Sequence, residues 1–269
     1  DVVHAAQNLA RAAGEGDPHG IDKDASERLT AGLAHEINNP LSVIMASVGF
    51  MRSELDEFGK GAGRALDAGE LSEVCSDALI GAERILRIVN DFRLFSRLDS
   101  EPQKHVDLRE VLDHALSGAS YNLGPKAQVV RDFQDVPSVW GSEQGLEQVF
   151  MGLLNNAGYA IKGGEEPRVS IIGRQREEGW VVVEVRDNGV GIAPEHLGRI
   201  FDPFFTTKPP GTGTGLGLSI CYGIVSGLGG SIEVDSAPGK GSLFRVKLPR
   251  TPEASAVPTA GARPGAAHP

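Results

Sequence analysis

Leu33-Ala34-His35-Glu36-Ile37-Asn38-Asn39-Pro40-Leu41 is the stretch that decides the fold of the first part of this chain. It belongs to a longer pattern in which apolar residues recur every three or four positions, as on one side of a helix. These residues are Leu33, Ile37, Leu41, Ile44, Val48, Met51 and Leu55. At about 100° per residue, His35 falls on the opposite side of the helix. Three small or polar residues share that side: Asn39, Ser42 and Ala46. The pattern therefore predicts a helix that packs on a partner and exposes His35.

A second amphipathic helix is predicted from about Gly69 to Asp99, after a glycine cluster at 59–63 that ends the first helix near Glu57. Its apolar positions form a heptad pattern: Leu71, Val74, Ala78, Gly81, Ile85, Ile88, Phe92 and Phe95. Two such helices joined by a short loop predict an antiparallel hairpin. A lone hairpin leaves apolar surface open, so we expect a homodimer that forms a four-helix bundle. Pro40 either bends the first helix after His35 or fits a bend in the packing.

The second part of the chain predicts an α+β fold, an α/β sandwich with helices on a mixed sheet. Helices are expected at 108–116, 142–161, 194–200 and 215–227, and strands at 128–133, 168–175, 180–186, 231–235 and 242–248. The expected organisation is an N-terminal linker (1–24), the hairpin domain (25–100), a linker (101–106), the α/β domain (107–249) and a disordered tail (250–269).

Composition excludes several classes of protein. The net charge of −10 argues against a nucleic-acid partner, and no apolar run is long enough to span a bilayer. The basic residues Arg84, Arg87, Arg93 and Arg97 are interpreted as the solvated side of a helix. Cys75 and Cys221 lack metal-ligand spacing, which predicts reduced thiols and a cytoplasmic fragment. The chain begins with Asp, so we expect a fragment of a longer protein, which could be anchored in a membrane.

Two glycine-rich segments suggest a nucleotide site. The segment 187–192, Asp-Asn-Gly-Val-Gly-Ile, follows a predicted strand, and its carboxylate can accept a hydrogen bond from the exocyclic amine of adenine. An Asn-Gly hairpin turn is the alternative. The segment 211–218, Gly-Thr-Gly-Thr-Gly-Leu-Gly-Leu, opens a helix whose backbone N–H groups suit a polyphosphate. It fits neither the P-loop nor the Rossmann pattern.

Two further segments extend this site. Asn155 and Asn156 lie on a predicted helix and offer carboxamide oxygens, which together with phosphates can hold Mg²⁺. A solvent-facing helix residue is the alternative for Asn156. The segment 201–208, Phe-Asp-Pro-Phe-Phe-Thr-Thr-Lys, is either a lid that brings Lys208 to phosphate or an aromatic cluster that anchors a loop.

In this order, the segments resemble the transmitter core of a bacterial sensor histidine kinase of two-component signalling. The first domain resembles the dimerisation and histidine-phosphotransfer hairpin, and the second the ATP-binding domain shared with Hsp90, MutL and type II topoisomerases. The resemblance covers roughly residues 26–249. The His-Glu-Ile-Asn-Asn-Pro box at 35–40 and the Thr-Thr-Lys after the phenylalanines are most similar to the nitrogen-regulation type.

The resemblance implies a role for each matching residue. His35 would accept a phosphoryl group from ATP, Glu36 would act as a base toward the imidazole, and Asn39 would place a water that dephosphorylates the partner. Asn156 would bind Mg²⁺, and Asp187 would read the adenine. The residues implied in shaping the base pocket and wrapping the phosphates are Gly189, Gly191, Lys208, Gly213, Thr214, Gly215, Leu216 and Gly217. The partner would be a response regulator that receives the phosphoryl group on an aspartate and docks near Ser42, Ala46 and Ser47.

One departure from the family bears on activity. Gly152 stands where the family's box carries an earlier asparagine, and Tyr159 stands where a basic residue is frequent. These changes thin the metal and phosphate ligands, unless Asn155 compensates. An ATP-binding dimeric interaction module with weak or no kinase activity is therefore the alternative function. An ATPase of the topoisomerase or MutL kind is a third, although it needs no exposed His-Glu pair.

Overall fold

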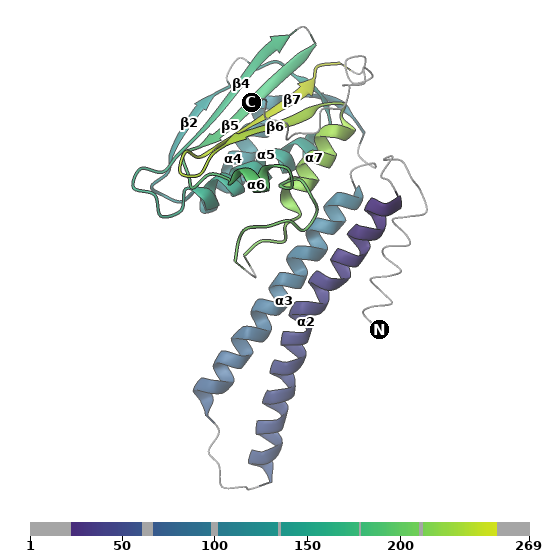
Figure 1. Cartoon of the computed structure of the whole chain (residues 1–269), viewed down its shortest axis with the longest axis vertical. Helices are drawn as coiled ribbons and strands as arrows, with labels where there is room; N and C mark the ends of the chain where they lie inside the picture. Colours follow the sequence, from purple (N-terminus) through teal and green to yellow (C-terminus); the bar gives the residue numbers. More distant parts are fainter. Residues whose placement is uncertain are drawn as a thin grey trace. The chain divides into compact units, whose positions relative to one another are not determined.

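The computed structural model describes residues 23–60, 67–97, 102–133, 136–177, 179–209 and 212–251 (Figure 1). The expected N-terminal linker (1–24) lies outside these ranges except for its last two residues, and the expected tail (250–269) lies outside them except for its first two. The chain divides into two compact units. One contains the helical hairpin with the loop Thr206–Thr214, and the other contains the α/β fold. No helix in the described ranges is long and apolar enough to cross a membrane.

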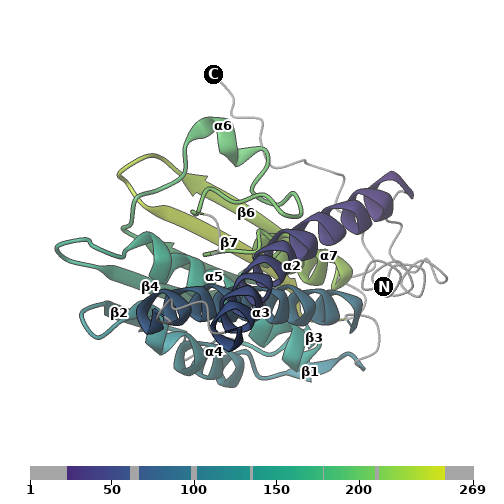
Figure 2. The ribbon, with the colours of Figure 1, turned by 90° about the horizontal axis from the view of Figure 1, so that it is seen from below.

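The hairpin consists of α2 (Lys23–Gly59) and α3 (Ala68–Arg97), which lie side by side in Figures 1 and 2. Asp67 begins α3 by accepting hydrogen bonds on Oδ1 from the backbone N–H groups of Gly69 (2.8 Å) and Glu70 (3.1 Å). The predicted antiparallel hairpin is confirmed, and its helices end within a few residues of the predicted positions.

The contact between the two helices differs from the predicted stripe by about one residue. Leu33 and Ile37 are buried as predicted, but the seam continues through the buried Pro40 and Ser47. Val48 and Leu55, which were assigned to the stripe, are 51% and 56% exposed. The reason is a close approach of α3 to α2. A Cβ on Gly81 would lie 2.9 Å from Ile44 Cγ1 and 3.1 Å from the Pro40 carbonyl oxygen. α2 therefore turns Pro40 toward α3 and continues through it without ending.

The α/β unit is built on one five-stranded mixed sheet with the order β2-β4-β5-β7-β6. β2 runs parallel to β4, and the other neighbours are antiparallel. α4, α5 and α7 cover one face of the sheet (Figures 1 and 2). The bounds are α4 (Leu108–Leu123), β2 (Gln128–Asp132), α5 (Glu143–Ala160), β4 (Arg168–Glu177), β5 (Trp180–Asp187), α6 (Pro194–Leu197), α7 (Gly217–Gly227), β6 (Ser231–Ser236) and β7 (Ser242–Pro249). The predicted fold class is confirmed.

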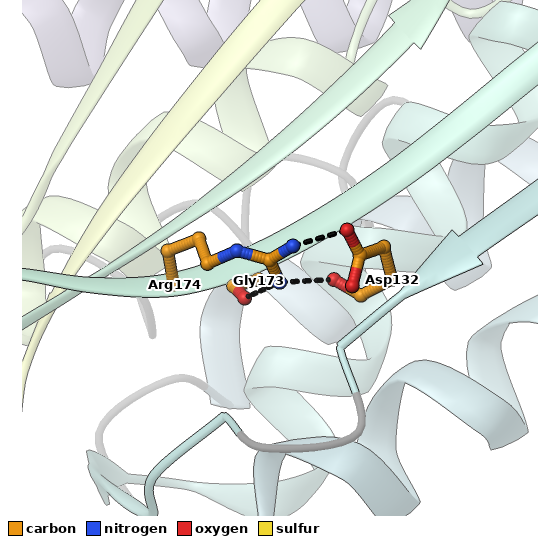
Figure 3. Close-up of polar contacts among 3 residues, drawn as sticks. All are labelled: Asp132, Gly173 and Arg174. Atoms are coloured by element: carbon orange, nitrogen blue, oxygen red, sulfur yellow. Dashed lines mark hydrogen bonds and ion pairs between the residues drawn. The ribbon is translucent and has the colours of Figure 1, made fainter.

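The core of this unit lies between the sheet and the three helices. β5 shows the alternation expected of a sheet with one covered face, because Val181, Val183 and Val185 are buried and the residues between them are less so. The edge strand β2 is held by Arg174 of β4. Its guanidinium donates to the Asp132 carbonyl over 2.9 Å, to the Gly173 carbonyl over 2.8 Å and to the Asp132 carboxylate (Figure 3). These contacts pair β2 with the sheet at its parallel edge.

A second, two-stranded sheet was not expected from the sequence. β1 (Lys104–Val106) pairs with β3 (Val139–Gly141), although the sequence places Lys104–Val106 in the linker. Trp140 Nε1 donates to Gln103 Oε1 over 2.8 Å, and Lys104 forms an ion pair with Glu143 at 2.6 Å. The hydrogen bond from Lys104 lowers the pKa of Glu143. The chain is therefore attached to the α/β unit from Gln103 onward.

Candidate functional site

His35 lies on the exposed side of α2, as predicted. Asn39, Ser42 and Ala46 are also exposed, so they form a continuous strip along the helix below the imidazole. Ser42 Oγ donates to the Asn38 carbonyl over 2.8 Å, which turns its hydroxyl back onto the helix. The strip is narrow and lacks large side chains, which leaves the imidazole accessible from solvent.

Ser47 does not belong to this strip. Its side chain is only 8% exposed because it lies seven residues after Pro40, in the seam that faces α3. The prediction that a partner docks against Ser47 is therefore wrong, whereas Ser42 and Ala46 lie on the exposed side.

Glu36 pairs across the hairpin with an arginine that sequence reasoning had set aside. Arg84 Nη2 donates to Glu36 Oε2 over 2.7 Å, and each side chain is only 21% exposed. The interpretation of Arg84 as a solvated residue is thus wrong, although Arg87, less than one turn later, is exposed. Gly81, a small residue in the heptad pattern, was the one signal for this contact, but the residues it meets are known only from the structure. Placing the small Gly81 against Pro40 and Ile44 sets an antiparallel register that brings residue 84 opposite residue 36.

In the α/β unit, Asp187 ends β5 and points into a turn that closes around its carboxylate. Asp187 Oδ1 accepts hydrogen bonds from the backbone N–H groups of Gly189 (2.8 Å) and Ser242 (3.3 Å). The residue is 5% exposed, and burial raises the pKa of its carboxyl group, against the opposing effect of these hydrogen bonds. Both backbone bonds use Oδ1, and the Ser242 hydroxyl also hydrogen-bonds the carboxylate, so a ligand would use the lone pairs that these three bonds leave.

The turn after Asp187 packs too closely on its neighbours for larger residues. A Cβ on Gly189 would lie 2.4 Å from the carbonyl of Ala160, at the end of α5, and Val190 N–H donates to that same carbonyl over 3.1 Å. Gly191 has φ 71° and would place a Cβ 2.0 Å from the Ala237 carbonyl oxygen. This segment is not a hairpin turn, because β5 pairs with β4 and β7 and not with the next strand, β6. A cavity of about 480 Å³ opens beside the turn; its lining includes Ala160, Lys162, Glu166, Asn188 and Val190.

α5 carries the predicted metal ligand but offers little else to a cation. Asn156 is half-buried on this helix. Asn155 faces α4 instead, where its Oδ1 accepts a hydrogen bond from Asn122 Nδ2 over 2.9 Å. Gly152 faces α7, because a Cβ there would lie 2.9 Å from Cys221 Sγ. Asn155 is therefore poorly placed to act as a second amide ligand on this helix, and the expected metal ligand remains Asn156.

The glycine-rich segment is anchored at both ends by aromatic and backbone contacts. The Phe201 ring lies 5.4 Å from that of Tyr222 on α7, and Arg199 lies over the Phe205 ring at 4.8 Å. Phe204 adopts φ 65°, and a Cβ on Gly215, which has φ 70°, would lie 2.3 Å from the Phe204 carbonyl carbon. The segments on the two sides of the loop, Phe204 before it and Gly215 after it, thus contact each other through their backbones. The aromatic residues anchor this loop, as one of the two interpretations of the sequence proposed.

The predicted phosphate-binding residues lie before and after Gly215, in the loop and at the start of α7. Leu216 is buried just before α7, which begins at Gly217, so the N-terminus of the helix directly follows the loop. Within the loop, a Cβ on Gly213 would lie 3.2 Å from Lys208 Cδ, and Lys208 N–H donates to Thr206 Oγ1 over 3.1 Å. Burial lowers the pKa of the Lys208 ammonium group. Thr214 is half-buried between these groups.

Among the described residues, no group of three or more His, Cys, Asp or Glu side chains is arranged to hold a metal ion. Asn156 is a hard oxygen ligand of the kind that Mg²⁺ accepts when phosphates and water complete its coordination. The residues present therefore fit a metal that enters with a nucleotide.

Comparison with known proteins agrees with these two sites. Residues 25–101 match the family described as His Kinase A (phospho-acceptor) domain. Residues 141–252 match the family of histidine kinase-, DNA gyrase B-, and HSP90-like ATPases. The two matches lie on the two units, one with His35 and the other with Asp187.

Sequence relatives support the same assignment. The sensor histidine kinase ZraS of Klebsiella oxytoca is 35% identical over 224 residues, which cover 82% of this chain and 45% of ZraS. The sensory histidine kinase/phosphatase NtrB of Rhodobacter capsulatus is 33% identical over 232 residues, covering 82% of this chain and 61% of NtrB. The chain thus spans less than two thirds of the length of either relative.

Among solved structures, histidine kinase ThkA in complex with response regulator protein TrrA matches with a TM-score of 0.62. The alignment covers 84% of this chain and 62% of that one at 24% identity, so it bears on the fold alone. The first family match contains His35 and the second contains the turn after Asp187. The chain therefore carries the transmitter core of the sensor histidine kinases, a phospho-acceptor domain followed by a histidine kinase-, DNA gyrase B- and HSP90-like ATPase domain.

Proposed function

We propose that this chain uses ATP to phosphorylate His35 and then passes the phosphoryl group to an aspartate of a response regulator. The observation that carries this proposal is that one chain holds both an exposed histidine beside a carboxylate and a buried aspartate at a glycine-rich turn. The first group can accept a phosphoryl group, and the second can bind the nucleotide that donates it. ZraS and NtrB are both longer than the segment that matches this chain, and we assign detection of the stimulus to segments outside that match.

In the phosphorylation step, the imidazole nitrogen of His35 attacks the γ-phosphorus of ATP. A nitrogen–phosphorus bond forms, the bond to the bridging oxygen breaks, and ADP leaves with that electron pair. The imidazole loses its remaining ring proton as charge develops, and the Glu36 carboxylate is the base that accepts or shares it. The other requirements of the step are positioning and charge neutralisation.

The nucleotide is proposed to bind along the turn after Asp187 and the glycine-rich loop that precedes α7. The Asp187 carboxylate accepts a hydrogen bond from the exocyclic amine of adenine, while Gly189 and Gly191 let the backbone approach the ring. The phosphates lie against the loop and the first turn of α7, whose N-terminus favours an anion. The residues proposed for this contact are Lys208, Gly213, Thr214, Gly215, Leu216 and Gly217. Mg²⁺ supplies charge neutralisation when bound, and Asn156 would hold it together with the phosphates.

The response regulator is proposed to dock along the exposed strip on α2 that carries Asn39, Ser42 and Ala46. Small residues below His35 let the receiver domain bring its aspartate to the phosphorylated imidazole. Asn39 lies one turn after His35, where its amide can orient a water that hydrolyses the phosphorylated partner. Asn39→Ala is then expected to lengthen the lifetime of the phosphorylated partner without blocking the labelling of His35.

The hairpin is proposed to form a homodimer through a second apolar side. Three residues of α2 (Met45, Val48, Leu55) and three of α3 (Leu79, Leu86, Val89) are large, apolar and at least 36% exposed. On each helix they lie roughly 50–130° beyond the seam in the same rotational sense. In an antiparallel pair, equal offsets fall on the same side of the hairpin, opposite to His35. A second copy that covers this side completes a four-helix bundle.

The test is incubation with γ-³²P-ATP and Mg²⁺, followed by treatment with acid. Acid-labile label that disappears in His35→Gln supports the proposal, because phosphohistidine hydrolyses in acid. Acid-stable label, or label retained in His35→Gln, contradicts it. ATP binding without any label favours the alternative of a dimeric interaction module with weak or no kinase activity. Gly152 is the residue that suggests this alternative. ATP hydrolysis without label favours an ATPase of the topoisomerase or MutL kind.

A further inference from the structure

Among the side chains that the structure describes, Arg84 is the one bound to Glu36, the residue after the histidine. Its Nη2 donates to Glu36 Oε2 over 2.7 Å, and the two residues come from facing helices, 48 positions apart in the chain. Among the hydrogen bonds of the described residues, Glu36 accepts only this one. The other carboxylate oxygen, Oε1, therefore remains available as an acceptor.

The geometry of Arg84 is not one that stability alone would select. Its Nε atom is buried and, within the described part of the chain, has no hydrogen-bond partner. A buried donor without an acceptor lowers stability, and such groups in native proteins call for an explanation in function. Arg87, which faces solvent, donates its own Nε to the Glu83 carbonyl of the same helix. Within the described part of the chain, Arg84 Nε makes no such bond to its own helix, and the guanidinium extends to Glu36 instead.

We propose that Arg84 is a positioning residue for the phosphorylation of His35, acting through Glu36; this inference rests on the function proposed above. Arg84 and Glu36 lie on the side of the seam that also carries His35, so the guanidinium holds the carboxylate on that side. His35 and Glu36 are neighbours in sequence, and side chains at i and i+1 do not face each other on a helix. An unrestrained Glu36 would sample several rotamers in solvent, and the bond to Arg84 selects one set of them.

Arg84 also compensates the charge of Glu36 at the place where ATP must arrive. The γ-phosphate is negatively charged, and a lone carboxylate beside His35 would repel it. The guanidinium carries the opposite charge and cancels that of the carboxylate. Orientation and charge compensation both predict that removal of Arg84 slows the chemical step and leaves nucleotide affinity unchanged, because none of the residues proposed to bind the nucleotide lies on α2 or α3.

The test compares Arg84→Gln, Arg84→Lys, Glu36→Gln and the double variant in single-turnover labelling of His35 by γ-³²P-ATP. We expect Arg84→Gln to lower the rate constant roughly tenfold, with the same half-saturating ATP concentration and the same final labelled fraction. Arg84→Lys, which keeps the charge but not the planar fork, should recover part of the rate. In the Glu36→Gln background, Arg84→Gln should cause little further loss, because the residue it positions is already altered.

Arg87→Gln is the matched control, since it makes the same change on the same helix and should label at the wild-type rate. Arg84→Met keeps the apolar stem packed and replaces Arg84→Gln in the comparison if that variant unfolds. A hairpin that is merely loosened would lower the final labelled fraction and the melting temperature instead of the rate constant. A wild-type rate in Arg84→Gln, or an equal loss with and without Glu36, overturns the role of Arg84. Absence of acid-labile label in the wild type overturns the proposed function as well.

Discussion

The thiol of Cys221 fills the space beside Gly152, where a Cβ would lie 2.9 Å from the sulfur. Cys221 is buried, and its Sγ contacts the Val149 carbonyl at 3.5 Å. Burial raises the pKa of the thiol to about 12, so it stays protonated and unreactive at neutral pH. α7 carries Cys221 and begins at Gly217, directly after the glycine-rich loop. The absence of a side chain at position 152, where the resemblance leads us to expect an asparagine, is thus tied to the position of the helix that follows this loop.

This relationship predicts how the missing asparagine can be restored. Gly152→Asn alone should lower the free energy of unfolding by about 1–3 kcal/mol, because the new side chain overpacks the contact with Cys221. Adding Cys221→Ala should recover the stability and give tighter ATP binding in the presence of Mg²⁺ than in the wild type. Thermal unfolding and titration with a fluorescent ATP analogue, with and without Mg²⁺, measure both. Wild-type stability in Gly152→Asn would show that α7 can shift to make room for the asparagine without lowering the free energy of unfolding.

Asp187, the residue proposed to bind adenine, is expected to lower the stability of the folded protein at neutral pH. Its folded-state pKa is raised by burial, so the folded state holds its proton more tightly than the unfolded state. The wild type should therefore lose stability as pH rises from about 3.9, the unfolded value, through the folded pKa. Asp187→Asn keeps an oxygen for the N–H groups of Gly189 and Ser242 and removes this loss, so it should be as stable as the wild type or more so at neutral pH.

The same variant should bind ATP roughly 10- to 100-fold more weakly, because the amide presents a donor where adenine requires an acceptor. Melting curves across pH and a binding titration test the two effects together. Asp113→Asn is the matched control, since Asp113 lies on the exposed surface of α4 and pairs with Arg131 at 3.5 Å. Unchanged ATP affinity in Asp187→Asn would refute the assignment of Asp187 as the residue that binds adenine.

Gly215 should be intolerant of any side chain. It has φ 70°, and a Cβ would lie 2.3 Å from the Phe204 carbonyl carbon, so even alanine forces the segments on the two sides of the loop apart. We expect Gly215→Ala to weaken ATP binding at least tenfold while the sheet stays folded. Gly227→Ala, at the other end of α7 with nothing within 4 Å of its Cβ, is the control and should bind normally. Equal affinities in the two variants would separate the loop from phosphate binding.

The sequence predicts the elements of this protein better than their contacts. Periodicity locates both helices of the hairpin, but it cannot tell Leu41 from Pro40 as the residue in the seam. That choice depends on how closely α3 approaches at Gly81, which is a property of the pair. The burial of Ser47 and the ion pair of Arg84 follow from the same register. Both were missed for this one reason.

The nucleotide-type site shows a similar limit. Motifs identify Asp187 and the glycines, because backbone demands at a turn are local. The strand at Lys104–Val106 escapes detection, since three residues pairing with Val139–Gly141 across more than 30 positions leave no periodic signal. The orientation of Asn155 toward Asn122 likewise depends on the packing of α4 against α5. Contacts between elements distant in sequence are what a single sequence does not encode in readable form.

Neighbouring residues on α3 offer a direct test of the dimer. Leu79 and Ile80 are both large and exposed, at 61% and 54%, but they lie on opposite sides of the hairpin. Leu79→Glu places a charge on the side proposed to meet the second copy and should raise the dimer dissociation constant at least 100-fold. Ile80→Glu makes the same change on the side of His35 and should remain dimeric. Sedimentation equilibrium distinguishes the two, and Cys75, exposed and near the same apolar side, provides a thiol for labelling. Dimers of equal strength in both variants, or a monomeric wild type, would exclude this side as the interface.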